Sequence, residues 1–217
     1  MAHKTIPTTV VVQVLYRYCD YDTPFWARSN TKSGRWHTAG DGPTQYLSST
    51  TDGAWADLIR NEALVTEEEI ALVRMPLWQC RIDQAYIVDY SDFEKAEAAG
   101  FPPDALIDDD QERCRAEGKR LRELGYGGIA APAAALPGAT TTTLFGGKVS
   151  IDWSATTRLA SAIPAAVLTV GAPPRGLLAR TRFIGQKHAD YEQYRSRRLA
   201  QKRARARKRS GGRRSDK

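Results

Sequence analysis

The spacing of hydrophobic and polar positions in the first third of the chain predicts two strands and a helix. The β-branched and aromatic run Thr9–Arg17 predicts a first strand, and Gln45–Ser48 predicts a short second one. Residues 49–52 (Ser-Thr-Thr-Asp) are good N-cap residues, and the apolar positions that follow have helical spacing. We therefore expect a helix that ends near Asn61.

The rest of the chain mixes strands and helices in no regular order. The predicted elements are strand-like runs within Ile70–Val88, a helix from Asp108 to Gly125, and strands at Gly128–Ala131, Thr140–Phe145 and Val149–Trp153. A doubly wound sheet would need regular alternation of strands and helices. The order therefore predicts an α+β fold with a mixed sheet core and flanking helices.

Charge divides the chain into an acidic body and a basic end. The 217 residues carry a net charge of +7, but Arg195–Lys217 alone has 12 Lys and Arg against one Asp, a local charge of +11. Residues 1–194 therefore carry −4. Pro173-Pro174 and the Arg- and Lys-rich sequence after them suggest that the compact domain ends near residue 170. We predict a domain over 1–170 and an extension over 171–217, with a helical or disordered basic tail.

The basic tail Arg195–Lys217 has three interpretations. It could bind nucleic acid through phosphate contacts, dock on an acidic partner, or act as a solubilising end. Aromatic residues are absent after Tyr194, which argues against base stacking within the tail.

Cysteine usage and hydropathy favour a cytoplasmic location. Cys19, Cys80 and Cys114 have neither metal-ligand nor disulfide-framework spacing, as expected in a reducing compartment. The chain shows no signal-peptide pattern, and its apolar segment Leu159–Val170 is too short to span a membrane. Asp108-Asp109-Asp110 is best explained by the positive end of the helix that follows, so no metal site is predicted.

Arg35, Tyr46 and Asp57 form the most informative group. A cation, a flat ring and a carboxylate are what a site needs to hold a dinucleotide and break a glycosidic bond. Each alone has a simpler explanation: a surface charge, a core aromatic and a solvated helix residue. Their order and spacing make the group worth testing.

These residues, with others, resemble the RES domain. Its Arg-Tyr pair near the first strand falls on Arg17-Tyr18, and its arginine before an aromatic falls on Arg35-Trp36. Its tyrosine at the start of a Tyr-Leu-Ser strand falls on Tyr46. The resemblance extends over residues 15–153 and includes Leu144-Phe145 at the end of a late strand.

Two family positions differ here. The position of the family's glutamate is occupied here by Asp57, whose side chain is one methylene shorter. The carboxylate is therefore drawn back toward the helix. A misplacement of about 1 Å can cost on the order of 100-fold in rate. The serine of its Pro-Ser-Ala loop is replaced by Ala133, which lacks the hydroxyl group. If a buried group of the substrate loses its hydrogen bond for this reason, the cost would be roughly 1–3 kcal/mol.

The resemblance implies a NAD-degrading toxin of a bacterial toxin–antitoxin system with an ADP-ribosyltransferase-like fold. It would cleave the nicotinamide–ribose bond by hydrolysis or phosphorolysis, with NAD as substrate and no cofactor. Arg17 and Arg35 would bind phosphates, Tyr18 and Tyr46 would pack on rings, and Asp57 would carry the chemistry with Arg35. Ala133 would lie in the substrate-binding loop.

The resemblance also implies an antitoxin partner with an Xre-type helix-turn-helix. Two alternatives stay open. The enzyme could transfer ADP-ribose to a macromolecule. A catalytically degenerate protein could instead hold a nucleotide while its tail binds nucleic acid or an acidic partner.

Overall fold

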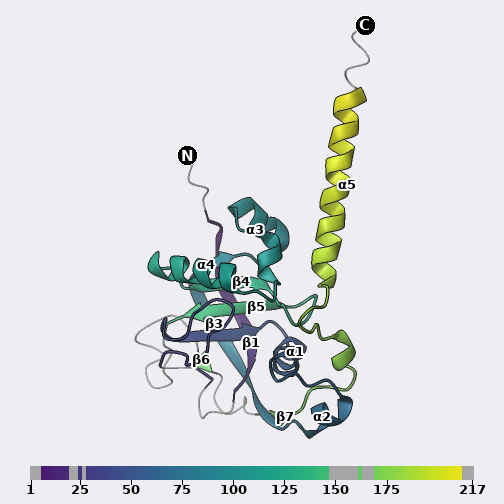
Figure 1. Cartoon of the computed structure of the whole chain (residues 1–217). Helices are drawn as coiled ribbons and strands as arrows, with labels where there is room; N and C mark the ends of the chain where they lie inside the picture. Colours follow the sequence, from purple (N-terminus) through teal and green to yellow (C-terminus); the bar gives the residue numbers. More distant parts are fainter. Residues whose placement is uncertain (1–5, 20–23, 26–27, 147–160, 163–168, 212–217) are drawn as a thin grey trace.

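The computed structural model describes residues 6–19, 24–25, 28–146, 161–162 and 169–211. A core of strands is surrounded by helices, and one long helix projects from the body at the C-terminal end (Figure 1). The predicted strand Val149–Trp153 lies outside the described residues.

The strands form a mixed sheet that closes on itself. They are β1 (Thr8–Tyr18), β2 (Thr44–Ser48), β3 (Met75–Asp89), β4 (Gly128–Pro132), β5 (Thr140–Phe145), β6 (Ser161–Ala162) and β7 (Thr169–Gly171). The order β1-β2-β5-β4-β3 is closed by a long antiparallel pairing of β3 with β1. Among the strand pairings that the structure describes, that of β3 with β4 alone is parallel. Four of the strand predictions are confirmed, and the runs within 70–88 form the single strand β3.

Helices cover the outside of this closed sheet. They are α1 (Thr51–Asn61), α2 (Glu67–Leu72), α3 (Phe93–Ala99), α4 (Glu112–Glu123) and α5 (Ala189–Gly211), with the 3-10 helices η1 (Pro103–Leu106) and η2 (Leu178–Arg180). The α+β class and the first helix are confirmed. The predicted start of α4 at Asp108 is wrong, because the side chains of Asp108 and Asp110 bond to backbone N–H groups in the turn before Glu112.

Three hydrophobic clusters fill the space between these layers. The first is built from the strands and includes Leu15, Leu47, Ile82 and Leu144. Two others lie between the sheet and its helical cover, one under α3 and α4 and one beside α1 and α2. Alternate residues of each strand thus face different cores, as the two-residue period of a strand requires.

Local chemistry fixes α1 directly after β2. The Thr50 side chain accepts a hydrogen bond from the Gly53 N–H at 3.0 Å, which confirms the N-cap predicted for this stretch. The Ser49 hydroxyl accepts from the Thr140 N–H at 3.0 Å on β5. These contacts hold the start of α1 against the sheet and so set the position of Asp57, two turns along.

Packing continues past the predicted domain end at residue 170. Leu177, Arg182 and His188 are all buried, and Leu177 belongs to the cluster beside α1. The Asp190 carboxylate accepts from the Gly138 N–H at 2.7 Å. The division at 170 stays a prediction, but this part of the extension packs on the body. Within the described chain, no helix combines the length and apolarity that crossing a bilayer requires.

Gly118 allows α4 to approach the loop that carries Arg35. A Cβ at this position would collide with the backbone carbonyl of Trp36, which is itself almost fully buried. Backbone cannot yield as a flexible side chain can, so this contact sets the distance between helix and loop.

We expect Gly118→Ala to lower the free energy of unfolding by roughly 1–3 kcal/mol, because overpacking outweighs the better helix propensity of alanine. Urea unfolding followed by circular dichroism measures this change. Lys119→Ala, at an exposed position of the same helix, is the control and should change stability by less than about 0.5 kcal/mol. Equal stability of Gly118→Ala and wild type would contradict the close contact.

Candidate active site

Asp57 is a half-buried carboxylate on α1, flanked along the helix by buried apolar residues. Its side chain makes no hydrogen bond to any residue in the described part of the chain. Burial raises the pKa of Asp57 to about 6, and the positive charges of Arg60 and Arg35 oppose that rise. A carboxyl group with a pKa near neutrality and unused lone pairs is suited to proton transfer or to stabilising a cation.

Arg35 is held by neutral groups. Its Nη1 donates to the backbone carbonyl of Asp108 at 2.7 Å and to that of Ala105 at 3.4 Å. Carbonyl oxygens orient the guanidinium without cancelling its charge. Arg35 therefore lies close enough to Asp57 for its positive charge to oppose the rise in the pKa of that carboxyl.

A buried ion-pair cluster lies beside this pair. Arg60 and Arg182, whose side chains are 8% and 6% exposed, both donate to one oxygen of Asp109, at 2.6 and 3.2 Å. Arg60 also donates to the Ala134 carbonyl at 2.7 Å. Burial and the nearby charges of Arg182 and Arg35 lower the pKa of Arg60. With three arginines against the carboxylates of Asp57 and Asp109, the region has an excess of positive charge.

The hydroxyl of Tyr46 organises the loop that presents Arg35. It accepts from the Trp36 N–H at 2.9 Å and lies 2.9 Å from Nδ1 of His37. The other ring nitrogen of His37 lies 2.9 Å from the Lys32 carbonyl, so it must donate there, and Nδ1 accepts the Tyr46 proton. His37 is buried, whereas a lone loop histidine is usually exposed.

Tyr18 and Arg17 lie on opposite sides of β1, because successive strand residues alternate. Tyr18 packs in the cluster beside α1, accepts from the Asn61 amide at 3.2 Å, and has its pKa raised to about 12 by burial, with Asp57 adding to the rise. Arg17 donates to the Gln45 side chain at 2.7 Å. The structure thus brings Tyr18, but not Arg17, to the Asp57 side.

Ala133 is buried, and its methyl group belongs to the apolar cluster beside α1. Its carbonyl accepts from Nε2 of His188 at 3.1 Å, and its N–H donates to Ala139 at 2.9 Å. Nδ1 of the buried His188 has no hydrogen-bond partner among the described residues. The loop after β4 is therefore fixed through its backbone from both sides.

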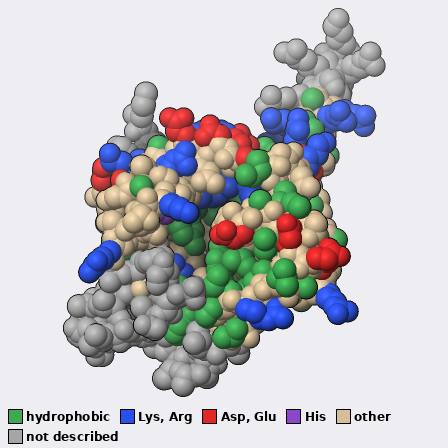
Figure 2. Space-filling model, turned by 60° about the horizontal axis from the view of Figure 1, so that its bottom comes forward, with side chains coloured by type: hydrophobic (Ala, Val, Ile, Leu, Met, Phe, Trp, Pro, Cys, Tyr) green, Lys and Arg blue, Asp and Glu red, His purple; other side chains and the backbone are tan. Residues whose placement is uncertain are grey.

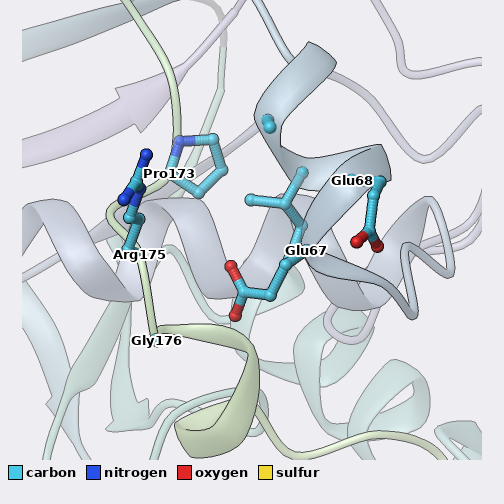
Figure 3. A pocket seen from close by; sticks show the side chains of 7 residues that line it. Glu67, Glu68, Pro173, Arg175 and Gly176 are labelled. Atoms are coloured by element: carbon cyan, nitrogen blue, oxygen red, sulfur yellow. The ribbon is translucent and has the colours of Figure 1, made fainter.

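A pocket of about 450 Å³ lies elsewhere, between α2 and the loop before η2 (Figure 3). It is lined by Glu67, Glu68, Ile70, Ala71, Pro173, Arg175 and Gly176. None of the residues predicted for the site lines it. The space-filling view shows a hollow near the centre of the face, with hydrophobic side chains around it (Figure 2).

Comparison with known proteins gives the family. The family model described as the RES domain matches residues 13–160, well over half of the chain. The chain belongs to the RES-domain family. No curated protein matches the sequence.

A solved structure supports the fold of this RES-domain protein. It is similar to a chain in the crystal structure of the MbcT–MbcA toxin–antitoxin complex of M. tuberculosis, with a TM-score of 0.52 and 24% sequence identity. The match covers 63% of this chain and 75% of the other.

Sequence reasoning missed the residues around Asp57 that come from other elements. Arg60 lies three positions after Asp57, so helical spacing could have indicated it. Asp109 was expected to stabilise a helix end, but it pairs with arginines instead. Arg182 and His188 follow the predicted domain end, and no local pattern marks them. The roles assigned to Arg17, Tyr18, Arg35, Tyr46, Asp57 and Ala133 stay predictions.

We expect Asp57→Asn to raise the thermal stability of the protein at pH 7.5. Because folding raises the pKa of Asp57, its ionisation destabilises the folded state as the pH rises from about 4 to 7. Removing that charge should gain on the order of 2 kcal/mol at pH 7.5, or several degrees in melting temperature.

At pH 4 the wild-type carboxyl is protonated in the folded state, so the two melting temperatures should nearly coincide there. Glu62→Gln, at the exposed C-terminal cap of α1, is a control for a change of charge on the same helix. If Asp57→Asn melts at a lower temperature than wild type at pH 7.5, the conclusion that the ionised carboxylate destabilises the folded state is wrong.

Proposed function

We propose that this RES-domain protein is a toxin-like enzyme that consumes NAD by cleaving the bond between nicotinamide and ribose. The observation that carries the proposal is Asp57, a half-buried carboxylate with a pKa near neutrality, beside the charges of Arg35 and Arg60 and without a hydrogen bond to any residue that the structure describes. Carboxylates in such surroundings are more often functional than structural.

The chemistry of this bond suits a site with one carboxylate. Nicotinamide leaves as a neutral ring because the pyridinium is already cationic, so no general acid is required, unlike in ordinary glycoside hydrolysis. The ribose develops oxocarbenium character, which the Asp57 carboxylate would stabilise. The same carboxylate would orient the attacking water or phosphate.

Arg35 is the residue best prepared for the pyrophosphate. Its orientation is fixed by carbonyl oxygens, and its charge is not cancelled by a carboxylate bond. Arg60 and Arg182 already share Asp109, so we assign them to holding the site and adding positive potential. Tyr18, whose pKa is raised in part by the nearby charge of Asp57, would pack on a ring of the substrate. Tyr46 and Ala133 stay predicted substrate-binding residues. Arg17 stays a predicted phosphate ligand, but its side chain lies on the other side of β1 from Tyr18, so it has no part in the chemistry at Asp57.

Further parts of the proposal rest on family membership and on the structural neighbour. The mixed closed sheet with helices outside supports an ADP-ribosyltransferase-like fold. The neighbour belongs to a toxin–antitoxin complex, which supports an antitoxin partner for this chain. We propose that this antitoxin carries an Xre-type helix-turn-helix and covers the site.

The test is the loss of NAD over time with purified protein, with and without phosphate. We expect wild type to consume NAD and release nicotinamide, and Asp57→Ala to be at least about 100-fold slower. Asp57→Glu keeps a carboxylate, on a side chain one methylene longer, and should be more active than Asp57→Ala. Faster loss with phosphate would identify phosphorolysis, and equal loss would identify hydrolysis.

Glu62→Ala is the matched control, because it removes a carboxylate from an exposed position at the end of the same helix. Equal NAD loss by wild type and Asp57→Ala would overturn the proposal. Labelling of an added macromolecule by ADP-ribose would instead favour a transferase. NAD binding without turnover would favour the degenerate nucleotide-binding protein.

A further inference from the structure

The loop from Ala133 to Ala139, between β4 and β5, is mostly buried and has no regular secondary structure. Its backbone polar groups therefore need partners from other elements, because burying them unpaired is costly. The carbonyls of its first three residues accept from the His188 side chain at 3.1 Å, the Arg60 side chain at 2.7 Å and the Arg182 N–H at 2.8 Å. Two of these three donors lie after β7, outside the part of the chain that the RES-domain model matches.

His188 is placed for its contact by the start of α5, where that helix meets the body (Figure 1). Its carbonyl accepts from the Glu192 N–H at 3.0 Å, so His188 is the N-cap residue of α5. Its ring packs edge-on against that of Phe93, with 6.0 Å between the centroids, and the residue is 2% exposed. The imidazole is therefore held in one orientation, in which Nε2 donates to the Ala133 carbonyl.

Local stability does not explain a histidine at this position. N-cap positions favour Ser, Thr, Asp and Asn, whose side chains bond to the first N–H groups of a helix. The His188 side chain bonds to the loop instead, and its buried Nδ1 has no hydrogen-bond partner in the described part of the chain. A buried polar atom without a partner lowers stability. The contact with Ala133 is thus what this side chain provides to the protein.

The loop connects His188 to the candidate active site. Ala134 follows Ala133, and its carbonyl accepts from Arg60 at 2.7 Å. Arg60 lies on α1 with Asp57. Burial raises the pKa of Asp57, and the charge of Arg60, ahead of that of Arg35, opposes the rise. A shift of the loop would therefore move Arg60 and change the positive charge near the Asp57 carboxylate.

We propose that His188 is a positioning residue for the cleavage of NAD. Through the Ala133 carbonyl it fixes the loop, and through the Ala134 carbonyl the loop keeps Arg60 beside Asp57. This inference rests on the proposed function. It extends the site past the matched family domain, to the start of α5.

Two substitutions separate the hydrogen bond of His188 from its packing. His188→Leu keeps an apolar side chain against Phe93 and removes the donor, whereas His188→Gln keeps an N–H donor. Steady-state cleavage of NAD by the full-length protein measures kcat and KM. We expect His188→Leu to lower kcat at least about 10-fold with little change in KM, because other carbonyls hold Arg35, the proposed ligand of the pyrophosphate. His188→Gln should keep most of the wild-type kcat.

The pH dependence is a readout that a merely structural role of His188 would not change. Asp57 is faced by Arg60 on its own helix, by Arg35 from the loop before β2 and by Tyr18 on β1. Displacing Arg60 weakens the main charge that lowers the pKa of Asp57, so this pKa should rise. The acid limb of kcat/KM should then move to higher pH in His188→Leu and stay at the wild-type pH in His188→Gln.

Phe93→Leu is the matched control, because it loosens the packing around His188 and leaves the hydrogen bond to Ala133 in place. It should lower the melting temperature and keep the acid limb at the wild-type pH. An acid limb at the same pH in His188→Leu and wild type would overturn the inference. So would a loss of kcat in His188→Gln as large as that in His188→Leu. Wild-type protein that leaves NAD intact would instead overturn the proposed function, and this inference with it.

Discussion

The arrangement around Asp57 depends on one ion-pair cluster, in which Asp109 joins the buried side chains of Arg60 and Arg182. The cluster connects α1, the turn before α4 and the segment after η2. Arg60 is on the same helix as Asp57, and the carbonyl of Asp108 holds Arg35. Removing one member of a buried pair leaves an uncompensated charge and typically costs about 3–5 kcal/mol. The same ion-pair cluster therefore supports both the geometry of the site and the packing of the chain after β7, and its loss should disturb both.

Stability and chemistry oppose each other at Asp57. The fold half-buries its carboxylate, no residue in the described part of the chain gives it a hydrogen bond, and the positive charges of Arg60 and Arg35 oppose the resulting rise in pKa. A purely structural carboxylate would be paired, as Asp109 is. Under the proposed function, this cost in stability is what is expected of a carboxylate that stabilises a cationic transition state.

Sequence pattern was sufficient for elements whose signals are local. The run of β-branched residues in β1 and the Thr50 cap of α1 act within a few residues, and both were predicted. α2 and the start of α4 were not, since a six-residue helix has a weak pattern and Asp109 is drawn to distant arginines. At the site, the resemblance pointed to Asp57 and Arg35. It could not supply Arg182, because a contact between segments distant in sequence leaves no periodic mark.

α5 is a further case in which the sequence alone does not show a contact between distant segments. Its charge was evident from composition, but composition could not show that the first part of the tail is a helix held by α3. The three interpretations of the tail stay predictions.

The central claim is that a desolvated Asp57 carboxylate carries the cleavage of NAD, and the acid limb of the pH–rate profile tests it most directly. Values of kcat/KM for NAD measured from pH 4.5 to 8 should fall tenfold per pH unit below an apparent pKa of about 6, because protonation removes the required charge. A rate that stays constant down to pH 4.5 would contradict the account.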